Sequence, residues 1–158
     1  GDVYKRQVLN SITSLEMQHN VLLACNSLLK DNGTLILGTR SLGKATTTMK
    51  SKQATNRKRD IEFLDDEKFS VTFRNGVWTK QRFTTKKHLQ QELMPYFKDI
   101  ETLGNETRSN IYAICKNPVR FSNEEYKKAL NIEFNMTYPN GFKHNKHSEL
   151  INTILTNL

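Results

Sequence analysis

The sequence predicts an α/β fold, and three stretches of its 158 residues carry this prediction. Residues 20–40 indicate a helix, a tight turn and a buried strand. Residues 68–83 indicate a β-hairpin, and residues 99–103 and 111–116 indicate two more strands. Helices that alternate with strands over this length are typical of one small domain in which helices cover a sheet.

The first element pair spans residues 8–40, which we expect to form one βαβ unit. Its helix is indicated by apolar side chains that recur at helical spacing, at Leu15, Leu22, Cys25, Leu28 and Leu29. Thr13 and Glu16 have the spacing of a capping box at its start, and Asp31-Asn32-Gly33 supplies its stop. The apolar run 34–39 predicts a strand covered on both faces, and Val8-Leu9-Asn10 predicts the end of a preceding parallel strand.

This run of Val8-Leu9-Asn10, helix, Leu28-Leu29-Lys30, Asp31-Asn32-Gly33 and strand resembles the class I S-adenosylmethionine-dependent methyltransferases. It is similar to their region from the end of the fourth strand through the fifth, and the resemblance covers residues 8–117. It implies a partial Rossmann-like sheet whose final strand, 111–116, is antiparallel and lies between the strands 34–39 and 99–103. The family's glycine-rich loop and acidic ribose-binding residue have no counterpart in this sequence. The resemblance is therefore to a C-terminal half, with S-adenosyl-L-methionine as the cofactor of the complete protein.

The resemblance, together with the rule that ligands bind at the carboxyl ends of strands in open sheets, indicates the candidate site. Leu9 and Asn10 are candidate cofactor-binding residues, and Asn10, Ser11 and Arg40 are candidate catalytic residues. Asn10 either lines this cleft or merely turns the chain. The sequence has neither the (D/N)PP(Y/F/W) signature of amino-methylating DNA enzymes nor a Pro-Cys pair, so it does not identify the methyl acceptor.

A basic segment, residues 41–60, follows the strand and lacks apolar periodicity, so we expect a loop. Its cations are opposed by Asp60 alone, and the chain has a net charge of +8. Such a loop is either a solvated surface or a contact with phosphates. Under the second interpretation, Arg57, Lys58 and Arg59 are candidate substrate-binding residues.

The hairpin prediction depends on Asn75-Gly76, the preferred pair for a two-residue type I′ turn. Pairing outward from this turn places Phe73 opposite Trp78, Val71 opposite Lys80 and Phe69 opposite Arg82. We expect this face to be a packed aromatic cluster with basic chains lying over it. The alternative is a lid or a base-stacking surface, in which Trp78 and Arg82 contact substrate.

Two features define the remainder of the predicted domain. Thr84-Thr85 predicts the cap of a helix with Leu89, Leu93 and Phe97 on one stripe, ending near Pro95. Residues 118–158 predict a helical C-terminal extension, with a capping box at Ser122 and Glu125 and a second cap at Ser148.

The first seven residues, GDVYKRQ, resemble translated adaptor sequence, so we expect residues 1–7 to be a non-native leader outside the fold. Cys25 and Cys115 lie in apolar runs, which favours buried free thiols and a cytoplasmic protein. We expect no membrane segment. His144 and His147 are expected to be a surface pair, so no metal site is predicted.

Two functions follow from these patterns. In the first, the chain is a fragment of a methyltransferase that acts on an unidentified acceptor and is inactive alone. In the second, it is a non-catalytic, basic nucleic-acid-binding module.

Overall fold

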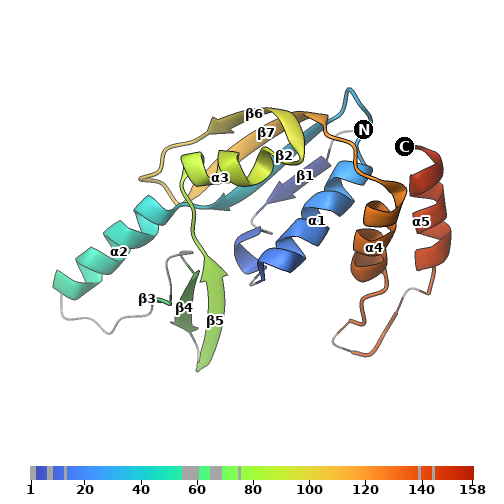
Figure 1. The fold of residues 1–158 in the computed structure, drawn as a ribbon. Helices are drawn as coiled ribbons and strands as arrows, with labels where there is room; N and C mark the ends of the chain where they lie inside the picture. Colours follow the sequence, from blue (N-terminus) through green and yellow to red (C-terminus); the bar gives the residue numbers. More distant parts are fainter. Residues whose placement is uncertain are drawn as a thin grey trace.

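The computed structural model of the chain is an α/β fold with two sheets and five α-helices in its described part (Figure 1). It describes residues 3–6, 9–12, 14–54, 61–64, 69–74, 76–138, 140–143 and 145–158. Of residues 3–6, 52–54, 61–63 and 72–74, only the backbone is described.

The main sheet is mixed and has the strand order β1-β2-β7-β6. β1 (Val3–Arg6) pairs in parallel with β2 (Thr34–Arg40). β7 (Asn110–Pro118) runs antiparallel to β2 on one side and to β6 (Phe97–Leu103) on the other. This confirms the predicted antiparallel strand between the strands 34–39 and 99–103.

The parallel unit β1-α1-β2 is confirmed, but its first strand lies earlier than predicted. Leu9–Ser11 forms a short 3-10 turn, η1, and Val8 lies outside the described residues. The exclusion of residues 1–7 from the fold is therefore wrong for 3–6, whose backbone pairs with Leu35 through Gly38. The sequence Val-Tyr in β1 has strand propensity that the exclusion ignored.

Helix α1 (Leu15–Ser27) is capped by Ser14, whose Oγ accepts from the Met17 amide at 3.4 Å. The predicted cap, Thr13, lies outside the described residues. The predicted stop at Asp31-Asn32-Gly33 is wrong, because the helix already ends at Ser27 with Leu28 as its C-cap, and none of residues 31–33 has a positive φ. These residues form a separate turn before β2, in which the Gly33 amide donates to the Lys30 carbonyl at 2.8 Å.

The core lies on one face of the main sheet. Leu35 and Leu37 of β2 pair with Cys115 and Ala113 of β7, and all four side chains are buried. Helices α1 and α3 cover this face (Figure 1). On the other face, Ile36, Tyr112 and Ile114 are half-buried. The expectation that the strand 34–39 is covered on both faces is thus wrong for the described part of the chain.

Both cysteines are free and buried, as predicted. Burial raises the pKa of the Cys115 thiol to about 12. In the unfolded chain the thiol has the ordinary cysteine pKa, about 8.5. Below about pH 8.5 the thiol is protonated in both the folded and the unfolded chain. Between the two values only the unfolded chain ionises, so the stability contributed by this group is lost as the pH rises.

This linkage gives a measurable pH dependence. Between pH 9.5 and 10.5, we expect the free energy of unfolding of the Cys115→Ala variant to fall by about 1 kcal/mol less than that of the parent chain. Urea titrations at the two pH values measure the difference. Equal losses in both proteins would show that Cys115 ionises freely in the folded state.

The segment after β2 forms a helix, so the prediction of a loop over residues 41–60 is wrong for its first part. Helix α2 spans Leu42–Ala54, and Ala45 is buried. The sequence lacks an apolar stripe because most of the helix is half-buried or exposed, yet Lys, Ala, Met and Gln are good helix formers. Arg57, Lys58 and Arg59 lie outside the described residues.

The hairpin prediction is confirmed in its register. β4 (Phe69–Arg74) pairs with β5 (Val77–Arg82), with Phe69 opposite Arg82, Val71 opposite Lys80 and Phe73 opposite Trp78. Gly76 has the positive φ, 80°, that the turn requires. A short strand, β3 (Ile61–Phe63), adds to β4 and makes a three-stranded sheet.

The expected packing of this hairpin is only partly correct. Phe69 is buried, and the Lys80 ammonium lies 4.3 Å from the centre of its ring. Trp78, however, is 54% exposed, so it is not the packed anchor that we predicted. The Phe73 side chain, its expected partner, is not among those described.

The next elements follow the prediction closely. Helix α3 (Lys86–Leu93) is capped by Thr85, which accepts from the His88 amide at 3.2 Å, and its C-cap is Met94, just before Pro95. Leu89 and Leu93 are buried on one stripe. Phe97 belongs to β6 and not to the helix, because Pro95 has already ended it.

The C-terminal extension is helical, as predicted, and it is part of the core. Helix α4 (Asn123–Phe134) has the capping box of Ser122 and Glu125, and it places Tyr126 and Leu130 in the core cluster beside α1. Helix α5 (His147–Thr156) begins after Lys146 without a side-chain cap, so the predicted cap at Ser148 is wrong. The Ser148 position is already inside the helix.

None of the described helices has the length and apolar character needed to span a bilayer.

Candidate functional site

A small cavity lies at the carboxyl end of β2, beside the turn η1. Side chains from η1, α1, β2, β5 and α3 surround it: Leu9, Asn10, Gln18, Thr39, Arg82, Thr84, Leu89 and Glu92. Its free volume is about 10 Å³, roughly the space that one water molecule needs. Leu9 and Asn10, which we expected to line a cleft at this edge of the sheet, thus line a closed cavity in the described part of the chain.

Arg82 closes the cavity by joining two helices. Its Nη1 donates to Gln18 Oε1 of α1 at 3.0 Å, and its Nη2 forms an ion pair with Glu92 of α3. The Arg82 side chain is 14% exposed and that of Glu92 is 31% exposed. A charged hydrogen bond with this much burial is stronger than a pair on the surface.

Gln18 extends this network to the turn that bears Asn10. Its Nε2 donates to the carbonyls of Leu9 at 3.0 Å and Ile12 at 3.1 Å, so one side chain satisfies two backbone acceptors of the turn. The network thus fixes the position of η1 relative to Arg82.

Asn10 is the polar group of this site that is left unsatisfied. It is 5% exposed, and its Oδ1 is buried without a hydrogen-bond partner in the described part of the chain. An unpaired buried carbonyl costs about 1–3 kcal/mol and needs an explanation, as do Ser70 Oγ and His147 Nδ1, the other two such side-chain atoms among the described residues. Asn10 Oδ1 is therefore an acceptor available to a group that donates a hydrogen bond.

The electrostatic effect of Glu92 reaches beyond the ion pair. Burial raises the pKa of the Tyr96 hydroxyl, and the negative charge of Glu92 raises it further. The Tyr96 hydroxyl lies 2.5 Å from Nδ1 of His19. His19 is exposed, but this contact gives it a fixed partner.

The structure brings together three of the predicted site residues and separates the others. Leu9, Asn10 and Arg82 line the cavity. Ser11 is exposed on the same turn, and Arg40 meets the site through its backbone, whose carbonyl accepts from the Thr84 amide at 3.1 Å. Trp78 lies four residues from Arg82 along β5, outside the cavity lining.

Sequence reasoning missed four polar residues that line the cavity, Gln18, Thr39, Thr84 and Glu92. Thr39 had a usable signal, because it is polar at the end of an apolar strand whose carboxyl end forms the predicted cleft. Gln18 and Glu92 had none, since each looks like an ordinary polar residue of a surface helix.

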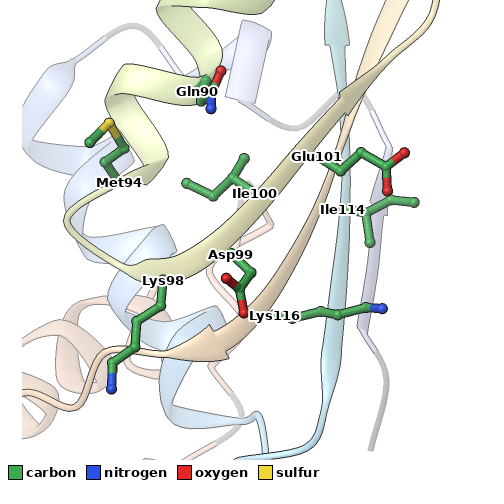
Figure 2. Close-up of a pocket in the computed structure, with 8 residues that line it drawn as sticks. All are labelled: Gln90, Met94, Lys98, Asp99, Ile100, Glu101, Ile114 and Lys116. Atoms are coloured by element: carbon green, nitrogen blue, oxygen red, sulfur yellow. The ribbon is translucent and has the colours of Figure 1, made fainter.

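A second concavity lies along the outer strand β6 and is open to solvent (Figure 2). It measures about 580 Å³ and is lined by Gln90, Met94, Lys98, Asp99, Ile100, Glu101, Ile114 and Lys116. Lys116 pairs with Thr34, so the groove lies toward the amino end of β2. On β6 it includes the charged residues Lys98, Asp99 and Glu101, and charged side chains are common protection of an edge strand.

No group of three His, Cys, Asp or Glu side chains in the described residues is arranged to hold a metal ion. His147 is half-buried at the start of α5, and His144 lies outside the described residues.

The coupling of Arg82 to Glu92 can be measured with a double-mutant cycle. We expect Arg82→Met and Glu92→Gln to interact by about 1–2 kcal/mol in the free energy of unfolding, because both groups are partly shielded from water. Lys80→Met, a change of an exposed cation on the same strand, serves as the control with Glu92→Gln. A coupling energy near zero for Arg82 would mean that the pair is effectively solvated.

Comparison with known proteins gives little further information. No protein-family model and no curated protein matches the sequence. Among solved structures, the fold is similar to that of the PH0226 protein from Pyrococcus horikoshii, with 14% sequence identity and a TM-score of 0.49. The match covers 74% of this chain and 53% of the PH0226 chain, so this chain spans about half of that protein's length. A similarity at this level carries no argument about function.

Proposed function

We propose that this chain is the C-terminal half of a class I S-adenosylmethionine-dependent methyltransferase, inactive alone and transferring a methyl group in its complete form. The observation that carries the proposal is the strand order β1-β2-β7-β6, with β7 antiparallel to both of its neighbours. This is the order that the sequence resemblance implies for the end of that family's sheet.

The position of Asn10 supports the same proposal. It follows β1 at the carboxyl end of the parallel pair β1–β2, where open sheets bind ligands, and it carries an unused buried acceptor. In the complete protein, Asn10 Oδ1 would accept a hydrogen bond from the acceptor nucleophile or the cofactor. Catalysis would then depend mainly on holding the two reactants in line.

The described residues do not form a complete cofactor site. A free volume of about 10 Å³ cannot admit S-adenosyl-L-methionine, and Arg82 and Glu92 fill the space beside Asn10. The proposal therefore assigns the binding of the cofactor mainly to a glycine-rich segment upstream of this chain. We also propose that the protein is cytoplasmic, in accord with its two free thiols.

The test is methyl transfer by the protein extended through its upstream segment. With S-adenosylmethionine labelled in the methyl group and a mixture of nucleic acids and cell extract as acceptors, we expect label to become covalently bound. Asn10→Ala in the extended protein should reduce the rate at least tenfold, whereas Asn157→Ala, a change on the exposed end of α5, should leave it unchanged. Failure to transfer label to any acceptor would count against the enzyme.

A second function, that of a non-catalytic nucleic-acid-binding module, is supported by the net charge of +8 and by the exposed Trp78. Salt-sensitive binding of oligonucleotides by an extended protein that neither binds nor uses S-adenosylmethionine would favour it over the enzyme.

A further inference from the structure

One face of β5 combines an exposed aromatic ring with two cations. Trp78, Lys80 and Arg82 alternate along the strand and so project from the same side. We name these three residues the β5 strip. At a rise of about 3.3 Å per residue, the strip extends roughly 13 Å from the Arg82 backbone to that of Trp78.

The inner end of the β5 strip lies at the candidate site. Arg82 lines the cavity that also contains Asn10, and its ion pair with Glu92 ties β5 to α3. Just beyond it, Thr84 pairs with Ser41, so the insertion formed by α2 and β3–β5 leaves the main sheet and returns to it at one point. A molecule lying along the strip therefore has one end at the cavity.

The outer end of the β5 strip presents apolar surface to solvent. Trp78 is 54% exposed, and its neighbour Val77 is 59% exposed. Figure 1 shows this end of the hairpin projecting away from the main sheet and its helices. Tryptophan combines a large apolar ring with one polar N–H group and is enriched at binding interfaces.

The middle of the β5 strip carries a positioned cation. The Lys80 ammonium lies 4.3 Å from the centre of the Phe69 ring, and the Arg82 guanidinium carbon lies 5.6 Å from the same centre. The buried Phe69 thus supports both cations from below. An aromatic ring followed by positioned cations is complementary to a nucleic-acid strand, in which bases alternate with phosphates.

We propose that the β5 strip binds a single-stranded nucleic acid and leads it to the site at Asn10, which makes that nucleic acid the methyl acceptor. Trp78 stacks on a base and Lys80 pairs with an adjacent phosphate. A double helix does not fit this arrangement, because its bases are stacked on one another and hide their faces. The identification of the acceptor rests on the proposed function, whereas the binding itself does not.

An exposed aromatic ring could bind several kinds of partner, and the excess of positive charge favours a nucleic acid among them. The chain has 24 Lys and Arg against 16 Asp and Glu, and residues 41–60 of the insertion contain six cations and one carboxylate in the sequence. A polyanion releases its condensed counterions when such cations bind it.

The test uses the 158-residue chain and dye-labelled 15-nucleotide RNA and DNA strands, with duplexes of the same sequence, at several salt concentrations. We expect single strands to bind more tightly than duplexes. Trp78→Ala should weaken the binding of single strands about 5- to 150-fold without changing its salt dependence. Trp78→Phe should restore most of the affinity. The strand that binds more tightly, RNA or DNA, identifies the type of nucleic acid that the protein binds.

Changes in charge should act on the salt dependence instead. Lys80→Ala should reduce the log–log slope of affinity against salt by about 1 unit, and the triple change of Arg57, Lys58 and Arg59 to alanine by about 2 to 3 units. Phe142→Ala, which removes an aromatic side chain of similar exposure in the connection between α4 and α5, is the matched control and should have no effect.

Three results would overturn the proposal: no binding of single strands at low salt, equal binding by the Trp78→Ala variant, or equal competition by an acidic polypeptide, which would indicate a protein partner. The melting temperature of Trp78→Ala should stay within about 2 °C of the parent, so loss of binding cannot be attributed to unfolding. If the extended protein binds single strands but transfers no methyl group, the nucleic-acid site stands and the proposed enzyme is refuted. If it transfers methyl groups but binds no single strand, the proposed enzyme stands and the nucleic-acid site is refuted.

Discussion

Replacing Asn26 by alanine is expected to lower the free energy of unfolding by about 3–5 kcal/mol. Asn26 is fully buried in α1, and its Nδ2 donates to the carbonyls of Tyr96 at 2.8 Å and Val119 at 3.0 Å. Its Oδ1 accepts from the Tyr126 hydroxyl. One side chain therefore joins α1 to the start of β6, the end of β7 and helix α4. Its loss removes three hydrogen bonds from the core, although the Tyr96 carbonyl still accepts from the Val119 amide and the Tyr126 hydroxyl from the Phe121 amide.

Urea titration of the parent and variant measures this effect, with Asn157→Ala as the control. Asn157 also donates through Nδ2, to the Thr153 carbonyl at 2.7 Å, but it is exposed, so its change should stay within about 0.5 kcal/mol. A loss below 1 kcal/mol for Asn26→Ala would show that the C-terminal helices are not fixed to the sheet as described.

The second large effect concerns the cofactor. We expect the 158-residue chain to show no saturable binding of S-adenosylmethionine at concentrations up to about 1 mM, because it has no glycine-rich loop that leads into a helix N-terminus. Isothermal titration calorimetry measures this directly. Micromolar affinity of the chain alone would place a cofactor site within residues 8–40 and would refute our account of the division between the two halves.

Local signals in the sequence predicted much of this fold. The hairpin register follows from Asn75-Gly76 because a two-residue turn fixes which residues pair. The ends of α3 follow from Thr85 and Pro95, since both act on their own backbone. The place of β7 was predicted from the resemblance alone, because strand order depends on contacts between distant residues.

The missed elements were those without a local signal. Helix α2 buries Ala45 but has no apolar stripe, so its segment resembled a loop. In the site, Asn10 was found from the rule for open sheets. Glu92 joins the site through Arg82, and Gln18 joins it through Arg82 and the turn η1. Neither contact has a local signal, because Arg82 is 64 residues from Gln18 and 10 from Glu92 in the chain. The exposure of Trp78 was missed because a cross-strand pair does not specify which face of a hairpin is covered.

The most direct test of the central claim is a calorimetric titration of S-adenosylmethionine into the protein extended through its upstream segment. We expect one site per chain with micromolar affinity, and at least a tenfold loss of affinity or of the methyl-transfer rate in the Asn10→Ala variant of the same protein. An extended, folded protein that takes up no S-adenosylmethionine at 1 mM would contradict the assignment of this chain to a methyltransferase.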